Sequence, residues 1–275
     1  AAVTEHKECV TLAKRRLPRM QGSVDGKLVA EVLLRLAASE RVLGDLDAAL
    51  EHTGQVLSRT ERGGSHGLRC RAKSLCGQIY EQRGQFDLAE RYFHDALELA
   101  RTIGDELEEE RARWAIAARH LTAGALDDAA RDFEQLLTQA NARGEKLRVT
   151  QYVNALGIVA HERAKYDDAE VAYRRMIELA KPAGDRRSLA NALNNIAVVR
   201  RDQGRFDDAL QLCAKGARIL ADLDQVENLA YVRIVESQIL LERAAAKDAK
   251  AGKDAGKADN ADALKKADEA LDLGL

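Results

Sequence analysis

Proline, aromatic residues and net charge are all scarce in this chain of 275 residues. Two prolines and 4% aromatic residues argue against a β-sandwich. The 43 basic and 45 acidic residues leave a formal charge of −2, which provides no field to attract nucleic acid or an anionic membrane. No apolar run approaches the roughly 20 residues that span a bilayer, and the N-terminus lacks a signal-peptide core. We therefore expect a cytoplasmic protein that binds neither nucleic acid nor membrane.

Motifs for catalysis, metals and cofactors are missing as well. The four cysteines form no CxxC pair, which favours reduced thiols. His161-Glu162 lacks the second histidine of a helical zinc motif. The glycine-rich residues 63–67 lack the Gly-Lys-Ser/Thr ending of a phosphate-binding loop. We expect no enzyme activity, no metal and no cofactor.

A turn-like motif recurs every 40 residues along the chain. It reads Gly44-Asp45-Leu46-Asp47-Ala48-Ala49, then Gly84 to Ala89, Gly124 to Ala129, Ala164 to Ala169 and Gly204 to Ala209. Alanine, leucine, arginine and glutamate dominate the segments between the motifs, and these residues favour helices. A fixed period of this length is typical of stacked helical hairpins. The sequence therefore predicts an all-α solenoid of antiparallel helix pairs.

The period divides the chain, which we predict to be one solenoid over residues 1–275, into units. Five complete units are expected at 25–64, 65–104, 105–144, 145–184 and 185–224. Residues 1–22 align with the second helix of a unit, so they form either half of a repeat or a capping helix. This start inside a repeat, together with the absent initiator methionine, suggests a fragment of a longer protein.

The last part of the chain, residues 225–275, reads as a degenerate sixth unit. Its residues 244–260 are Ala, Lys, Gly and Asp without an apolar period, so we expect a flexible, solvated insert there. A lysine-rich site for an anionic ligand is the alternative, although Asp248 and Asp254 offset the lysines.

Two positions in every unit carry a small residue, which lets paired helices approach closely. The first helix has Ala37, Gly77, Ala117, Gly157 and Ala197. The second helix has Ala49, Ala89, Ala129, Ala169 and Ala209. Together with the Gly-x-(Phe/Tyr/Leu)-Asp-x-Ala turn, this pattern resembles the tetratricopeptide repeat, whose usual unit is shorter, at about 34 residues. The longer form is similar to the repeats of kinesin light chains, of adaptors named for a Leu-Gly-Asn motif and of bacterial regulatory domains.

This resemblance implies a right-handed superhelix whose first helices line a concave groove for a peptide or a partner helix. Family geometry implies that particular registers of the first helices face this groove. The candidate binding residues at those registers are Arg71, Arg111, Trp114, Gln151, Asn154, Asn191, Asn194, Asn195 and Arg201.

Each candidate type has a binding interpretation and a structural alternative. Asparagine amides offer a donor and an acceptor to a peptide backbone, or they bridge neighbouring helices. The arginines suit a carboxylate or phosphate, or they are merely solvated. Trp114 suits a hot spot on the groove wall, or packing between repeats.

The main hypothesis is a non-catalytic scaffold that binds a protein or peptide partner. The alternative is a ligand- or peptide-sensing module from a larger bacterial signalling protein, such as a kinase or a transcription regulator. Self-association through exposed repeat ends is a third reading.

Overall fold

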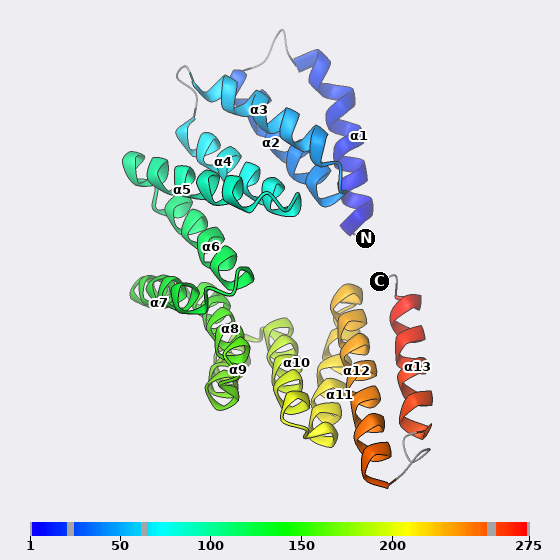
Figure 1. The fold of residues 1–275 in the computed structure, drawn as a ribbon. Coiled ribbons are helices and arrows are strands. Elements are labelled where there is room, and N and C mark those ends of the chain that lie inside the picture. The colour runs from blue at the N-terminus through cyan, green and yellow to red at the C-terminus, as the bar shows by residue number, and fades with distance from the viewer. Residues whose placement is uncertain (1, 21–24, 62–64, 252–256, 274–275) are drawn as a thin grey trace. The chain divides into compact units, whose positions relative to one another are not determined.

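The structure is a computed structural model that describes residues 2–20, 25–61, 65–251 and 257–273. All regular secondary structure within these ranges is α-helical (Figure 1). The helices are α1 (Ala2–Met20), α2 (Gly26–Val42), α3 (Leu46–Glu61), α4 (His66–Gln82), α5 (Phe86–Ile103), α6 (Glu106–Thr122), α7 (Leu126–Arg143), α8 (Lys146–Glu162), α9 (Tyr166–Ala183), α10 (Arg186–Asp202), α11 (Phe206–Ala221), α12 (Val226–Ala251) and α13 (Lys257–Asp272). The predicted all-α repeat solenoid is confirmed.

The chain divides into two compact units, which we call the N-terminal unit (Ala1–Asp132) and the C-terminal unit (Phe133–Leu275). We call α2, α4, α6, α8, α10 and α12 the first helices, because each opens a helix pair. The odd-numbered helices from α3 to α13 are the second helices, and α1 packs on α2. Each first helix contacts the second helix that follows it most extensively in the pairs α2/α3, α4/α5, α8/α9, α10/α11 and α12/α13.

The turns inside the helix pairs place one residue in the left-handed region of backbone space. Glycine occupies this position at Gly44, Gly84, Gly124 and Gly204, where φ lies between 71° and 84°. Ala164 takes the same position in the pair α8/α9 with φ of 55°. A Cβ atom in this region clashes with the neighbouring carbonyl, so the alanine keeps the turn at the cost of strain.

Side-chain caps begin several of the first helices. The side chains of Asp25, Ser65, Asp105 and Asp185 accept hydrogen bonds from backbone amides of α2, α4, α6 and α10, respectively. Such caps satisfy amides that have no partner within the helix. The first residue of each of these repeats therefore caps the helix pair that it begins.

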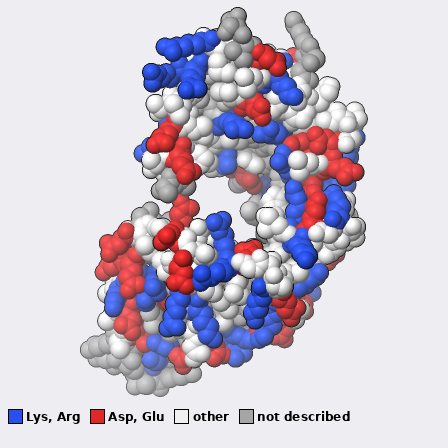
Figure 2. All heavy atoms as spheres, turned by 180° about the vertical axis from the view of Figure 1, so that it is seen from behind, with Lys and Arg blue, Asp and Glu red and all other residues white. Residues whose placement is uncertain are grey.

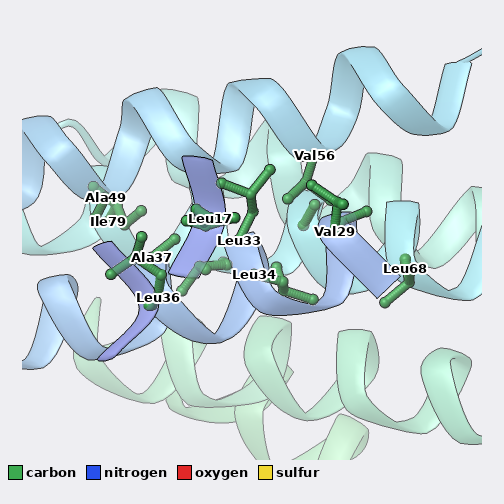
Figure 3. Close-up of a cluster of buried hydrophobic side chains, with 14 residues drawn as sticks. Leu17, Val29, Leu33, Leu34, Leu36, Ala37, Ala49, Val56, Leu68 and Ile79 are labelled. Atoms are coloured by element: carbon green, nitrogen blue, oxygen red, sulfur yellow. The ribbon is translucent and has the colours of Figure 1, made fainter. Parts of the chain in front are cut away.

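The core of the N-terminal unit forms where α1, α2, α3 and α4 meet. Figure 3 shows aliphatic side chains from these four helices pointing toward one another. The labelled residues are Leu17, Val29, Leu33, Leu34, Leu36, Ala37, Ala49, Val56, Leu68 and Ile79. Burying each leucine-sized side chain contributes about 1.5–3 kcal/mol. Apolar burial in this cluster therefore holds α1 on the helix pair that follows it.

The predicted small positions lie where the paired helices come closest. All five alanines of the second-helix series, from Ala49 to Ala209, have no exposed surface. A Cβ atom added to Gly77 would lie 2.4 Å from Cε1 of Phe93, and one added to Gly157 would lie 2.5 Å from Cε1 of Tyr173. In these two pairs an aromatic ring occupies the space that a first-helix side chain would need.

A second contact joins the helices of a pair near the turn, and its chemistry changes from pair to pair. Nδ1 of His52 lies 2.6 Å from Oε2 of the buried Glu40. At the same registers 40 residues later, the rings of Tyr80 and Tyr92 stack with centroids 5.3 Å apart. The next pair reverses the first one, because Nδ1 of His120 lies 2.9 Å from Oδ2 of Asp132. We call these contacts the near-turn pairs.

The predicted flexible insert at 244–260 is wrong for residues 244–251, which continue helix α12, and for residues 257–260, which open helix α13. Alanine and lysine are good helix formers, so the segment needs no apolar period to remain helical. Arg243 donates two hydrogen bonds to Asp259, at 2.9 and 2.7 Å, and Nζ of Lys247 lies 2.9 Å from the same carboxylate. Burial alone would raise the pKa of Asp259, but these hydrogen bonds lower it. Residues 252–256 lie outside the described residues.

The described helices give no sign of a membrane span. None of them combines the length and the apolar character that crossing a bilayer requires.

Candidate functional site

Consecutive first helices contact one another directly within each unit, as α2 with α4, α4 with α6, α8 with α10, and α10 with α12. Contacts between consecutive second helices are sparser. The first helices are therefore the closely packed side of each unit, and a ligand that lies across them can touch several repeats. We call this side the first-helix face of the unit.

One register of the C-terminal unit presents exposed side chains from three adjacent first helices. Gln151 on α8 and Asn191 on α10 are exposed, and neither makes a side-chain hydrogen bond within the described part of the chain. Tyr231 on α12 occupies the same register and is 54% exposed. We call Gln151, Asn191 and Tyr231 the open row. It offers two amides and an aromatic ring to a partner.

Asparagines about one turn further along α8 and α10 contact neighbouring helices. Nδ2 of Asn195 on α10 donates a hydrogen bond of 2.7 Å to Oδ1 of Asn154 on α8. Asn194 is only 4% exposed, and its Oδ1 lies 3.9 Å from Sγ of Cys213 in the same helix pair. The sequence predicts that Asn194 faces a ligand, but the helix turns about 100° per residue and points this side chain into the hairpin. It is left out of the site proposed below.

A charged network lies closer to the ends of the same helices. Nε2 of His161 on α8 lies 2.7 Å from Oδ2 of Asp202 on α10. Arg201 donates to Oδ1 of Asp202 at 2.8 Å and to Oε1 of Gln238 on α12 at 3.1 Å. Its Nε also lies 3.7 Å from Oε1 of Glu242. Arg201, a predicted binding residue, therefore joins α10 to α12, and its charge is already neutralised.

The first-helix face of the N-terminal unit carries the other predicted residues. Arg111 is ion-paired with Glu108, one turn earlier on α6, and Arg71 on α4 is partly exposed. Burial raises the pKa of the Glu108 carboxyl, and the positive charges of Arg111 and Arg71 oppose that effect. Trp114 is 38% exposed. Arg111 thus already holds a carboxylate of its own chain, while Trp114 keeps part of its surface exposed.

The structure joins Asn154 to Asn195 and leaves Gln151 and Asn191 exposed at one register, but it buries Asn194 and pairs Arg201 with acidic side chains. Other residues near these were missed by sequence reasoning. Tyr231, Asp202 and Gln238 were not predicted. The 40-residue register of Asn191 points directly to Tyr231, so the signal was present in the sequence. The bridging role of Gln238 had no such signal, because it depends on which rotamer Arg201 adopts.

The described residues offer no metal site, and charges of both signs are mixed on the face that Figure 2 shows. Figure 2 shows acidic and basic side chains interspersed on the visible face. In the part of the chain that the structure describes, no group of three or more His, Cys, Asp or Glu side chains is arranged to hold a metal ion.

Solved structures with the same fold include several helical repeat proteins. The chain is similar to BtubC (BKLC) from P. vanneervenii, with 19% identity, 81% of this chain and 91% of that chain covered, and a TM-score of 0.63. It is similar to a Rap protein complexed with competence and sporulation factor, with 12% identity, 99% and 84% covered, and a TM-score of 0.66. It is similar to NprR in complex with its cognate peptide NprX, with 17% identity, 99% and 85% covered, and a TM-score of 0.56.

A search of curated proteins finds no match to the chain. The sequence profile of the tetratricopeptide repeat matches residues 28–102 and 148–222, which together make up more than half of the chain. The matched stretches contain the repeated turns, the small positions and the helix pairs described above. The chain belongs to the tetratricopeptide repeat family.

Proposed function

We propose that this protein is a non-catalytic interaction scaffold that binds an extended peptide across α8, α10 and α12. The observation that carries the proposal is the open row: Gln151, Asn191 and Tyr231 are exposed at one register, and helix packing does not require their polar groups. Exposed side chains that share one face and are not needed for helix packing can contact a partner.

An extended peptide fits this spacing. Packed helices lie about 8–10 Å apart, and an extended chain advances about 3.3 Å per residue. A peptide that crosses the first helices therefore meets a new helix about every third residue. Each amide of Gln151 and Asn191 can donate to a peptide carbonyl and accept from a peptide N–H. The ring of Tyr231 adds apolar contact at one end of the row.

The bridges beneath the open row support binding by holding the helices in place. The hydrogen bond from Asn195 to Asn154 joins α8 to α10, and Arg201 joins α10 to α12. A fixed helix spacing lowers the ordering cost when the peptide binds. In this proposal Asn154, Asn195 and Arg201 position the site, and the open row touches the peptide.

The N-terminal unit offers a separate set of contacts. We assign Trp114 as an apolar anchor and Arg71 as a partner for a carboxylate, because both side chains are accessible on its first-helix face. Arg111 contributes less, since Glu108 already neutralises it.

A peptide-sensing module of a larger signalling protein is the second candidate. It is favoured by two similar structures, a Rap protein and NprR, which were solved with a bound factor or peptide. A kinase or DNA-binding domain encoded next to this chain would support the sensing role. A complete gene product without such a domain would favour the scaffold function instead.

The experiment is a selection of random peptides displayed on phage, with the purified chain as bait. The dissociation constants of enriched peptides are then measured by fluorescence polarisation for Asn191→Ala, Gln151→Ala and Tyr231→Ala. Truncating a central contact costs about 2 kcal/mol or more, so we expect a loss of about 30-fold for at least one variant. Gln139→Ala, at an exposed glutamine on the second helix α7, is the matched control and should bind normally. Peptides that bind all three variants as tightly as the wild type would refute the proposed site.

A further inference from the structure

Cavities recur between consecutive odd-numbered helices, on the side of the units away from the first-helix face. In the C-terminal unit one cavity of about 240 Å³ lies along α7 and α9, and one of about 330 Å³ lies along α9 and α11. The N-terminal unit has one of about 220 Å³ along α1 and α3. Their floors use the same registers, as shown by Leu33, Val153 and Leu193. The repeat therefore builds one groove several times.

The groove between α9 and α11, which we call the basic groove, has an apolar floor. The floor residues are Ile177, Leu193, Ile196 and Leu212. An α-helix turns about 100° per residue, so Leu193 and Ile196 point to the side of α10 opposite to Asn191. A partner in the basic groove would thus leave the open row accessible.

Four cationic side chains line the basic groove, and two carboxylates neutralise two of the four charges. Arg174 and Arg200 share the carboxylate of Glu170, which lies 2.7 Å from Nη2 of Arg174. Arg205 is ion-paired with Asp208. Lys215 has no ion pair within the described residues. The groove therefore carries an excess of two positive charges over an apolar floor.

This charge is specific to the basic groove and not a property of the repeat. Arg200 lines the basic groove, whereas the residues at its register on α8 and α2 are Ala160 and Glu40. At the register of Arg174 the preceding repeat has Glu134. Packing requires none of these cations, because the same helix pairs form without them.

We propose that the basic groove binds an acidic protein segment that inserts one apolar side chain between α9 and α11. The volume of about 330 Å³ lies at the lower end of the range of ligand pockets, about 300–1,000 Å³. Isoleucine and leucine on the floor take the apolar side chain, and Arg174 and Lys215 at the rim take the flanking carboxylates. The excess positive charge excludes basic segments and favours acidic ones.

The test is a phage selection of random peptides on the Gln151→Ala/Asn191→Ala variant, so that the outcome does not depend on the open row. The proposal expects enriched peptides in which Asp or Glu flank Leu, Ile or Phe. Their affinity should fall about tenfold in Arg174→Gln/Lys215→Gln, which corresponds to about 1.4 kcal/mol for the two exposed charged contacts together. Both side chains are exposed, and Arg200 remains to pair with Glu170, so this variant keeps its fold.

Arg175→Gln, one residue along α9 and lining the neighbouring cavity, is the matched control and should change affinity less than about twofold. Replacing the apolar residue of an enriched peptide by alanine should also abolish binding. Enrichment without acidic residues, or equal binding by Arg174→Gln/Lys215→Gln, would overturn the proposal. Competition by oligothymidylate, which is anionic but has no aliphatic anchor, would assign the groove to a general anion site instead.

Discussion

Replacing Gly77 by alanine tests whether the aromatic ring of Phe93 sets the distance between α4 and α5. The added Cβ atom would lie 2.4, 2.6 and 2.9 Å from three carbons of the ring. Phe93 is only 1% exposed, so the ring has no solvent space into which to move. Overpacking of this kind costs about 1–3 kcal/mol. Alanine in place of glycine within a helix contributes about 0.8–1.0 kcal/mol in the opposite direction.

Gly54→Ala in α3 supplies the matched control, because a Cβ atom there meets nothing within 4 Å. It should stabilise the N-terminal unit by about 1 kcal/mol, whereas Gly77→Ala should be neutral or destabilising by up to about 2 kcal/mol. The difference between the two variants therefore measures the overpacking. The pair α6/α7 limits how large this overpacking cost can be, because Ala117 and Phe133 occupy the same registers there and the helices accommodate both.

Urea unfolding followed by the fluorescence of Trp114, the single tryptophan, reports on the N-terminal unit. Phe93→Leu replaces the ring by a smaller side chain and completes a double-mutant cycle. In that background Gly77→Ala should regain much of the stability that it lacks relative to Gly54→Ala. If Gly77→Ala and Gly54→Ala raised the urea midpoint equally, the steric reasoning would be refuted.

Four further predictions concern strain, burial, charge and assembly. Ala164→Gly should raise stability by up to about 1 kcal/mol in urea unfolding, because relief of the left-handed alanine exceeds the entropic cost of glycine. Native alkylation at pH 8, read by mass spectrometry, should modify Cys9 well before the other thiols, because burial raises the pKa of three cysteines to about 11, 12 and 12. These are Cys70, Cys76 and Cys213. Arg41→Met should leave the melting temperature unchanged or raise it, because burial lowers the pKa of Arg41 and its buried Nε has no hydrogen-bond partner in the described structure. Self-association through repeat ends predicts a sedimentation coefficient that rises with protein concentration.

The sequence predicts those parts of the fold in which the same packing contacts recur in every repeat. The turn glycines, the alanines that pack between paired helices and the division into helix pairs all follow from one 40-residue period. The end of α12 could not be predicted in this way. Its residues have no apolar pattern, and the ion pairs of Arg243 and Lys247 with Asp259 form only where the folded chain brings α13 beside α12.

The candidate site was predictable in its registers but not in its contacts. Asn194 and Asn195 are neighbours in the sequence, yet one is buried and the other bridges to Asn154. A difference of one residue rotates a helical side chain by about 100°, which is finer than a repeat alignment resolves. The sequence alone does not show that Arg111 is less available to a ligand than the other candidates. Only its ion pair with the buried Glu108 shows that its charge is already neutralised.

The near-turn pairs determine where the gene could be recombined. Each pair lies within one hairpin, so exchanging whole hairpins keeps Glu40 with His52 and His120 with Asp132. A crossover placed at the turn would instead join the first helix of one hairpin to the second helix of another. It would then set Glu40 against an aspartate in a buried position, or His120 against a histidine. Chimeras and duplications of this chain should therefore be joined between the hairpins, where no such partnership is divided.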